Sequence, residues 1–190
     1  MKIEIGCGKS PREGYKTCDI RDLPNVDYVC TADNLPFKDE EIDEVYSRHV
    51  IHIFTLKEFL KVLEEWNRVL KYDGEVYIIC PDVLWHLKQI LNGDHQSLYN
   101  KKSGENHRYW GYGSVFGWQQ DEHDIHKFGY YFDLLKDILE EFGFGEIENL
   151  TDSGRGLENE PWHLEVKAKK KRKAPHYKEA SLYGHFDVTH

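Results

Sequence analysis

The chain has 190 residues, of which 39% are apolar and 31% charged, and its net charge is −9 at pH 7. This balance predicts one domain with a single core, and no apolar run approaches the roughly 20 residues that span a bilayer. The first expected strand starts at Lys2, so we expect no signal peptide. The four cysteines (Cys7, Cys18, Cys30 and Cys80) have no CxxC spacing. Reduced thiols in a cytoplasmic protein are therefore expected, rather than disulfides or a zinc site.

The negative net charge disfavours general nucleic-acid binding. One stretch departs from it: KAKKKRK, residues 167–173, has six basic residues in seven. The sequence leaves two interpretations of this basic run open. It is a solvated strand end, or it is a segment that contacts phosphate or directs targeting.

The first half of the chain alternates short apolar runs with one clear amphipathic helix. Strands are expected at 2–5, 15–20, 44–46 and 75–80. The TLKE sequence at 55–58 has capping-box spacing, and an apolar face then continues to Leu70. Gly74 is expected to be the C-cap glycine of this helix. A second helix is expected at about 83–91.

Residues 92–127 differ from the rest because they are polar, aromatic and rich in glycine and histidine, without periodicity. A loop of this length is usually functional, so a lid-like insertion is expected. A helix at 130–142 and strands at 145–150 and 163–169 follow. The alternation predicts an α/β fold with a mostly parallel sheet. We expect one domain over residues 1–170 and a C-terminal tail over 171–190.

Glycines after a first parallel strand allow a ligand to approach the backbone, and an acidic residue ending the next strand can bind ribose hydroxyls. Gly6, Gly8 and Asp19 fit this pattern, although a structural turn explains the glycines equally well. Asp19 follows Gly8 by 11 residues, whereas dinucleotide folds place the acid about 20 residues beyond the glycines. Pro11 stands where the third glycine of the dinucleotide motif would be, and residues 10–13 can supply one helical turn at best, whereas pyrophosphate needs a proper helix N-terminus. A nucleoside cofactor without pyrophosphate, such as S-adenosylmethionine, is expected.

Five stretches together resemble the class I S-adenosylmethionine-dependent methyltransferases, and most of all the small ones found with polysaccharide-biosynthesis enzymes. They are IEIGCG, TCDI, TADNLPFKDEEIDEVYSRHVIHIF, LEEWNRVLKYDGEVYIICPD and HKFGYYFDLLKDILEEFGF. The resemblance covers roughly residues 2–168. It implies a Rossmann-like sheet, mostly parallel with an antiparallel closing strand, helices on both faces, and S-adenosyl-L-methionine as the cofactor.

The resemblance also implies which residues bind the cofactor. It assigns the methionine end, the ribose, the adenine ring and the methionine amine to successive strand ends. Glu4, Gly6, Cys7 and Gly8 would line the methionine end, and Asp19 would bind the ribose hydroxyls. Ile20, Asp33, Asn34 and Leu35 would surround the adenine ring. Ser47 and Arg48 would approach the methionine amine. Asp33 has an alternative interpretation as a turn acid before Pro36.

Catalysis is expected on the insertion, in DEHDIHK (121–127). Methyl transfer needs the acceptor held close to the methyl group, and an oxygen acceptor benefits from a general base. His126 is the first candidate for this base and His123 the second. The alternatives are loop polar residues that face water, or a divalent metal held by Asp121, Asp124 and a histidine. No metal site is expected, because adjacent residues point in different directions.

The aromatic stretch YWGYGSVFGWQ (109–119) is suited to stacking a sugar ring, or else it forms a small core beneath the loop. Trp110, Tyr112 and Trp118 are the candidate substrate-binding residues, together with His52. The leading hypothesis is O-methylation of a sugar or glycan, with a small molecule or nucleobase as alternative acceptor. A non-catalytic adenosine-binding partner module is the competing hypothesis. A homodimer through the C-terminal tail is also open, and no membrane partner is expected.

Overall fold

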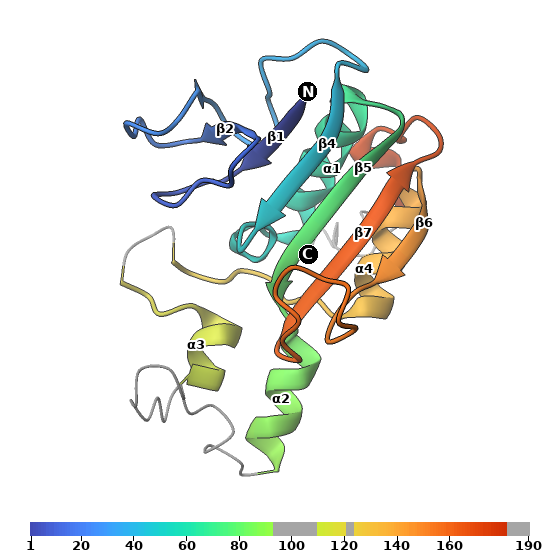
Figure 1. Cartoon of the computed structure of the whole chain (residues 1–190). Coiled ribbons are helices and arrows are strands. Elements are labelled where there is room, and N and C mark those ends of the chain that lie inside the picture. Colours follow the sequence, from blue (N-terminus) through green and yellow to red (C-terminus); the bar gives the residue numbers. More distant parts are fainter. Residues whose placement is uncertain (93–109, 121–123, 182–190) are drawn as a thin grey trace, which may run out of the picture.

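The computed structural model describes residues 1–92, 110–120 and 124–181. It contains one seven-stranded sheet with the order β3-β2-β1-β4-β5-β7-β6, shown in Figure 1. The strands are β1 (Lys2–Ile5), β2 (Lys16–Asp19), β3 (Tyr28–Val29), β4 (Ile42–Arg48), β5 (Leu70–Pro81), β6 (Phe144–Asn149) and β7 (His163–Lys170). The helices are η1 (Ile51–Ile53), α1 (Leu56–Val69), α2 (Val83–Leu91), α3 (Trp110–Phe116), α4 (Phe132–Glu141) and η2 (Tyr177–Glu179).

The strand directions agree with the expected mostly parallel sheet and its antiparallel closing strand. Strands β1 to β5 pair in parallel, and β7 runs antiparallel to both β5 and β6. The chain moves from β1 outward to β3 and then returns to the other side of β1 with β4. This reversal creates a switch point between β1 and β4, where open α/β sheets bind ligands.

One face of the sheet carries the main core. The strand registers align Ile3, Val45, Val76 and Ala168 across this face. These residues and the apolar sides of α1 and α4 form one buried cluster, and Figure 1 shows both helices behind the sheet. Both helices therefore contribute to a single hydrophobic core. None of the helices in the described ranges is long and apolar enough to cross a membrane.

The opposite face of the sheet is not covered by helices in the described residues, which differs from the expectation of helices on both faces. The same registers align Glu4, Tyr46, Tyr77 and Lys167 there. The two tyrosines form a small buried cluster with Ile79 and Leu150, and no described helix contributes a residue to this cluster. The connections from β1 to β2 and from β2 to β3 are too short for a covering helix. The ring of Tyr46 packs edge-on against Tyr77 at 5.8 Å, and the Arg12 guanidinium lies 5.0 Å from the Tyr46 ring. Aromatic and charged side chains therefore replace helices as the cover.

Helix α1 begins where the sequence predicts, but it ends earlier. Thr55 and Glu58 form the capping box in both directions. The helix ends at Val69, and β5 begins at the next residue. Gly74 therefore lies inside a strand instead of capping the helix, because the alignment of β5 with Ile42 of β4 extends the strand backward. A Cβ at Gly74 would lie 2.9 Å from the carbonyl oxygen of Lys71, which explains the glycine.

The basic run pairs with the chain's own acids and carbonyl groups, which favours the strand-end interpretation. Lys170 is buried and its Nζ donates to the carbonyl oxygen of Leu70 at 2.7 Å. The Arg172 guanidinium donates to two carbonyl oxygens at the end of α4. Ion pairs of the run include Lys167–Glu75, Lys169–Glu146 and Lys171–Asp73. These lysine contacts are to residues of β5 and β6, whereas the Arg172 contacts reach the end of α4.

The described part of the tail, residues 171–181, packs against its own chain. Asn67 of α1 is fully buried and makes three hydrogen bonds with the backbone. Its amide nitrogen donates to the carbonyl oxygens of Phe142 (2.9 Å) and Arg172 (3.0 Å), and its oxygen accepts from the Ala174 nitrogen at 3.0 Å. The division of the chain at residue 170 and the tail-mediated homodimer stay predictions.

We expect Asn67→Ala to lower the free energy of unfolding by about 2–4 kcal/mol, because three backbone groups, at the end of α4 and in the tail, lose their partner. Urea unfolding of the variant and the wild type measures this difference. Asn92→Ala, at an exposed asparagine, is the control and should change stability by about 0.5 kcal/mol or less. Equal losses in both variants would show that the Asn67 bonds do not hold the tail.

Candidate active site

A cavity lies at the switch point of the sheet, outside the carboxyl ends of the strands. Its volume is about 400 Å³, within the range of roughly 300–1,000 Å³ typical of small-molecule sites. The ends of β1 and β2 contribute to it, as do residues that follow β3 and β4 and residues on α1. Five of the predicted cofactor residues line this cavity: Gly6, Asp19, Ile20, Asp33 and Leu35.

Gly6 forms the turn at the end of β1 and needs to be glycine for two reasons. Its φ is +68°, a conformation that side chains disfavour. A Cβ there would lie 2.4 Å from the Cγ2 atom of Val50, which lines the same cavity. Its nitrogen donates to the carbonyl oxygen of Cys18 at 2.8 Å. The turn therefore brings bare backbone to the cavity wall, as the sequence predicts.

Asp19 ends β2 with its carboxylate almost fully buried. Oδ2 accepts from the Gly8 nitrogen at 2.9 Å, and both carboxylate oxygens accept from Arg21. Burial by itself would raise the pKa of Asp19, but the hydrogen bonds from Arg21 and Gly8 outweigh it and lower the pKa below its usual value. Asp19 is therefore an ionised acceptor at the cavity edge.

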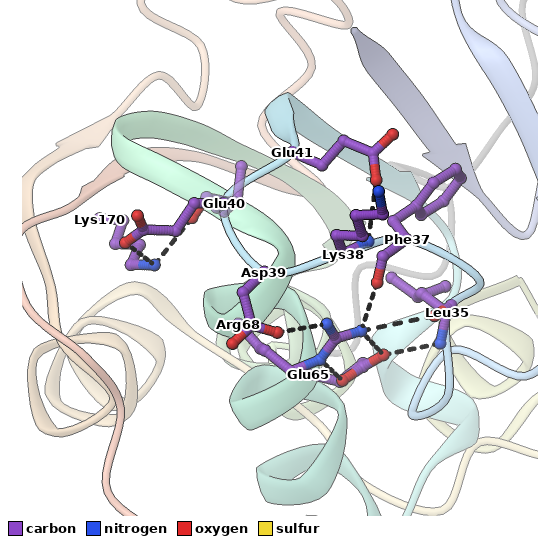
Figure 2. A network of polar contacts seen from close by, with 10 residues as sticks. Leu35, Phe37, Lys38, Asp39, Glu40, Glu41, Glu65, Arg68 and Lys170 are labelled. Carbon is purple, nitrogen blue, oxygen red and sulfur yellow. Dashed lines mark hydrogen bonds and ion pairs between the residues drawn. The ribbon is translucent and has the colours of Figure 1, made fainter.

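The loop that carries Asp33 and Leu35 is attached to α1 by a polar network (Figure 2). The Leu35 nitrogen donates to Glu65 at 2.7 Å, and Arg68 binds the same glutamate through Nε and Nη2. Arg68 also donates to the carbonyl oxygen of Phe37 at 2.9 Å. The pair with Glu65 raises the pKa of Arg68 above its ordinary value. This network holds the loop in place, so that Leu35 forms part of the cavity wall.

Six of the predicted cofactor residues do not line the cavity. Glu4 lies on the helix-free face of the sheet, where its carboxylate accepts from the Arg12 nitrogen at 2.6 Å. Ser47 faces the helices, as its register with Ile5 requires. Arg48 is exposed, with its Nε donating to Glu158 at 2.7 Å. The other three are Cys7, Gly8 and Asn34.

These three residues have structural contacts instead. Gly8 donates to Asp19, and the Asn34 nitrogen donates to the carbonyl oxygen of Thr31 at 3.2 Å in an exposed turn. Cys7 is buried, and desolvation, reinforced by the negative charge of Asp19, raises the pKa of its thiol to about 11. A neutral thiol at this position shapes the glycine turn.

A histidine cluster adjoins the cavity, formed by His49, His52, His126 and His163. The ring centroids of His52 and His126 are 4.0 Å apart, and those of His49 and His163 are 4.8 Å apart. His49 lines the cavity, and its ring centroid lies 6.0 Å from that of His52. His52 is buried, and its Nδ1 has no hydrogen-bond partner. Within the part of the chain that the structure describes, no group of residues could hold a metal ion.

His126 is oriented by the insertion. Its Nδ1 lies 2.9 Å from the carbonyl oxygen of Ser114 in α3, so Nδ1 carries the proton and Nε2 keeps its lone pair. Its backbone nitrogen donates to Phe116, and the next residue, Lys127, donates to the carbonyl oxygen of His52 at 2.8 Å. Burial lowers the pKa of His126. The ring is therefore neutral near pH 7, with Nε2 as an acceptor.

The other predicted acceptor residues lie on or near α3. Tyr112 is 44% exposed and Trp118 is 48% exposed. A Cβ at Gly113 would lie 2.9 Å from the Trp118 ring, so the indole packs on this glycine. The side chain of Trp110 and all of His123 lie outside the described residues.

Buried histidines make stability depend on pH. Burial lowers the pKa of His86 to about 4, and burial with the nearby His163 lowers that of His49 to about 3. An unfolded histidine titrates near pH 6.5. Below this value the unfolded chain binds protons that the folded chain does not, so we expect stability to fall as the pH drops from 7 to 5. The slope is up to about 1.4 kcal/mol per pH unit for each such group.

His86→Phe tests this expectation, because phenylalanine fills a similar volume without titrating. Urea unfolding at pH 7 and pH 5 should give a smaller difference for this variant than for the wild type. His176→Phe, at an exposed histidine of the tail, should keep the wild-type slope. An unchanged slope in His86→Phe would mean that His86 does not stay neutral in the folded chain.

The strand order, with antiparallel β7 between β5 and β6, defines the Rossmann-like fold of class I methyltransferases. A family model described as a methyltransferase domain matches residues 12–78. A mouse protein named "Probable tRNA methyltransferase 9B" is 31% identical in an alignment of 94 residues, which covers 44% of this chain. This chain spans only 20% of the length of that relative.

Solved structures share the fold over nearly the whole chain. A methyltransferase from Archaeoglobus fulgidus has a TM-score of 0.56 and 17% identity, over 89% of this chain and 85% of that one. One from Thermotoga maritima has a TM-score of 0.55 and 19% identity, over 90% and 82%. Together, these structures show that the chain has the Rossmann-like fold of class I methyltransferases, and the methyltransferase-domain model matches it over residues 12–78.

Proposed function

We propose that the chain transfers the methyl group of S-adenosylmethionine to a hydroxyl group of a sugar or glycan, with His126 as the general base. The observation that carries the proposal is the contact of His126 Nδ1 with the carbonyl oxygen of Ser114 at 2.9 Å. Its Nδ1 proton is bound to Ser114, so Nε2 is free to accept a proton. His126 also packs on His52, and its neighbour Lys127 lines the cavity.

The cavity residues bind and orient the cofactor in this proposal. Asp19 accepts hydrogen bonds from the ribose hydroxyls, and Ile20 and Leu35 contact the adenine ring, with Asp33 near its amine. Gly6 gives the methionine end access to the backbone. Glu4, Ser47 and Arg48 have no contact with the cavity, so their expected roles at the methionine end have no support from its lining.

Bound S-adenosylmethionine supplies an electrophilic methyl group on a sulfonium. The acceptor oxygen forms a bond to the methyl carbon while the carbon–sulfur bond breaks and its electron pair stays on sulfur. His126 takes the hydroxyl proton on Nε2 and later releases it to water. The described parts of the insertion, residues 110–120 and 124–127, belong to the lid, and Tyr112 and Trp118 offer aromatic faces on which a sugar ring can stack.

Two alternatives compete with this proposal. The mouse relative's name suggests a nucleobase acceptor in tRNA, but a net charge of −9 and a paired basic run offer little attraction for phosphates. A non-catalytic adenosine-binding module would bind the cofactor without turnover.

Mass spectrometry of the acceptors distinguishes these functions. The chain is incubated with S-adenosylmethionine and, separately, with nucleotide sugars, oligosaccharides, small phenols and a tRNA transcript. The proposal predicts S-adenosylhomocysteine formation and one added methyl group on a sugar hydroxyl. Methylation of tRNA alone would refute the sugar acceptor. Cofactor binding with no product from any acceptor class would favour the non-catalytic module.

A further inference from the structure

The carboxylate of Asp19 has all of its hydrogen-bonding positions filled. Oδ1 accepts from the backbone nitrogen of Arg21 at 3.0 Å and from its Nε at 2.9 Å. Oδ2 accepts from the Gly8 nitrogen at 2.9 Å and from Arg21 Nη2 at 3.0 Å. An ionised carboxylate accepts about four hydrogen bonds. A ribose hydroxyl can therefore bind Asp19 only if one of these donors moves.

The four donors differ in how easily they can move. The nitrogens of Gly8 and Arg21 belong to the backbone of the turns that follow β1 and β2, so they cannot swing away as the end of a side chain can. The Arg21 guanidinium is at the end of a side chain that is 47% exposed, whereas that of Asp19 is 3% exposed. Both residues line the cavity. Because the guanidinium is already half exposed, water can replace the Asp19 carboxylate as its partner at little cost in free energy. The guanidinium is therefore the donor that can move away from Asp19.

We propose that Arg21 occupies the ribose-binding positions of Asp19 and that its ion pair opens when the cofactor binds. This inference rests on the proposed role of Asp19 in binding ribose. Two N–H donors of the guanidinium are exchanged for two O–H donors of the ribose, so the carboxylate keeps its hydrogen-bond count. Arg21 thus stabilises the buried charge in the free protein, and it competes with the cofactor for the same two positions.

This competition predicts the direction of two effects. Removal of the guanidinium should tighten binding of any ligand that contains the ribose. Salt should also tighten binding to the wild type, because it screens the ion pair that must open. A direct contact between Arg21 and the cofactor predicts the opposite result for the substitution.

Isothermal titration with S-adenosylhomocysteine tests the proposal on wild type, Arg21→Ala and Arg21→Gln. We expect both variants to bind roughly three- to tenfold more tightly, as loss of a partly exposed ion pair allows. The wild-type affinity should rise between low and high NaCl concentrations, and the affinity of the variants should not. Adenine, which has no ribose, should bind the three proteins equally. Arg155→Ala, which removes an exposed arginine paired with Glu148, should match the wild type.

The outcomes separate this inference from the proposed function. Wild-type binding with equal or weaker affinity in both Arg21 variants overturns the competition and leaves the cofactor assignment standing. Failure of all the proteins to bind S-adenosylhomocysteine overturns both. Binding by the variants but not by the wild type supports the competition, since the ion pair would then exclude the ligand.

Discussion

Asp19→Ala is expected to weaken the binding of S-adenosylhomocysteine by roughly tenfold or more, which is about 1.4 kcal/mol. In our proposal the ribose donates two hydrogen bonds to an ionised carboxylate, and bonds to charged groups are the stronger kind. The loss should exceed the gain from releasing Arg21, because the alanine leaves no acceptor for either hydroxyl. Isothermal titration of variant and wild type measures the difference.

Two further variants make this result specific. Asp19→Asn keeps the side-chain shape and should also bind weakly, because an amide has one acceptor oxygen and no charge. Asp22→Ala, at an exposed acid on the same loop, should bind like the wild type. If Asp19→Ala bound with unchanged affinity and melted at the wild-type temperature, the ribose site would be elsewhere.

His126→Ala is expected to reduce methyl transfer to a hydroxyl acceptor by about 100-fold or more, the usual contribution of a general base. Its affinity for S-adenosylhomocysteine should stay within about threefold of wild type, because His126 does not line the cavity. Turnover is measured with the acceptor that the mass-spectrometry panel identifies, and affinity by titration.

The pH profile distinguishes a base from a packing residue. Since burial lowers the pKa of His126, wild-type turnover should be level near pH 7 and fall only at acidic pH, below the ordinary histidine value of about 6.5. His126→Ala should lose this fall along with the rate. His176→Ala, far along the tail, should keep wild-type turnover. Full turnover in His126→Ala would remove it from the mechanism.

Much of the fold could be predicted because local signals carry it. The capping box at Thr55 and Glu58 and the apolar periodicity after it fix the start and the buried face of α1. The strand–helix alternation predicts the parallel sheet, and the Gly8–Asp19 spacing predicts a nucleoside-sized site without a phosphate helix. These features depend on residues close together in the chain, so periodicity and spacing reveal them.

Other features depend on strand pairing, which a single sequence does not specify. Whether Glu4, Ser47 and Arg48 face the cavity follows from register, and a shift of one residue exchanges the two faces of a strand. The helix-free face is also a pairing result, because Tyr46 and Tyr77 become neighbours only when β4 and β5 align.

His163 was missed for a topological reason. It begins β7, and the antiparallel direction of β7 brings that start to the edge where the parallel strands end. An assignment of antiparallel direction to the last strand could have placed His163 beside His49. Arg21 carried no comparable signal, since only the folded turn brings its guanidinium back onto Asp19.

Isothermal titration of the wild-type chain with S-adenosylhomocysteine, with NADH as a parallel control, tests the central claim most directly. Our account predicts binding with a dissociation constant on the order of micromolar to tens of micromolar, as is usual for enzyme ligands, and no binding of NADH. Binding of NADH instead, or of neither compound, would contradict the assignment of the cavity at β1, β2 and β4 to S-adenosylmethionine.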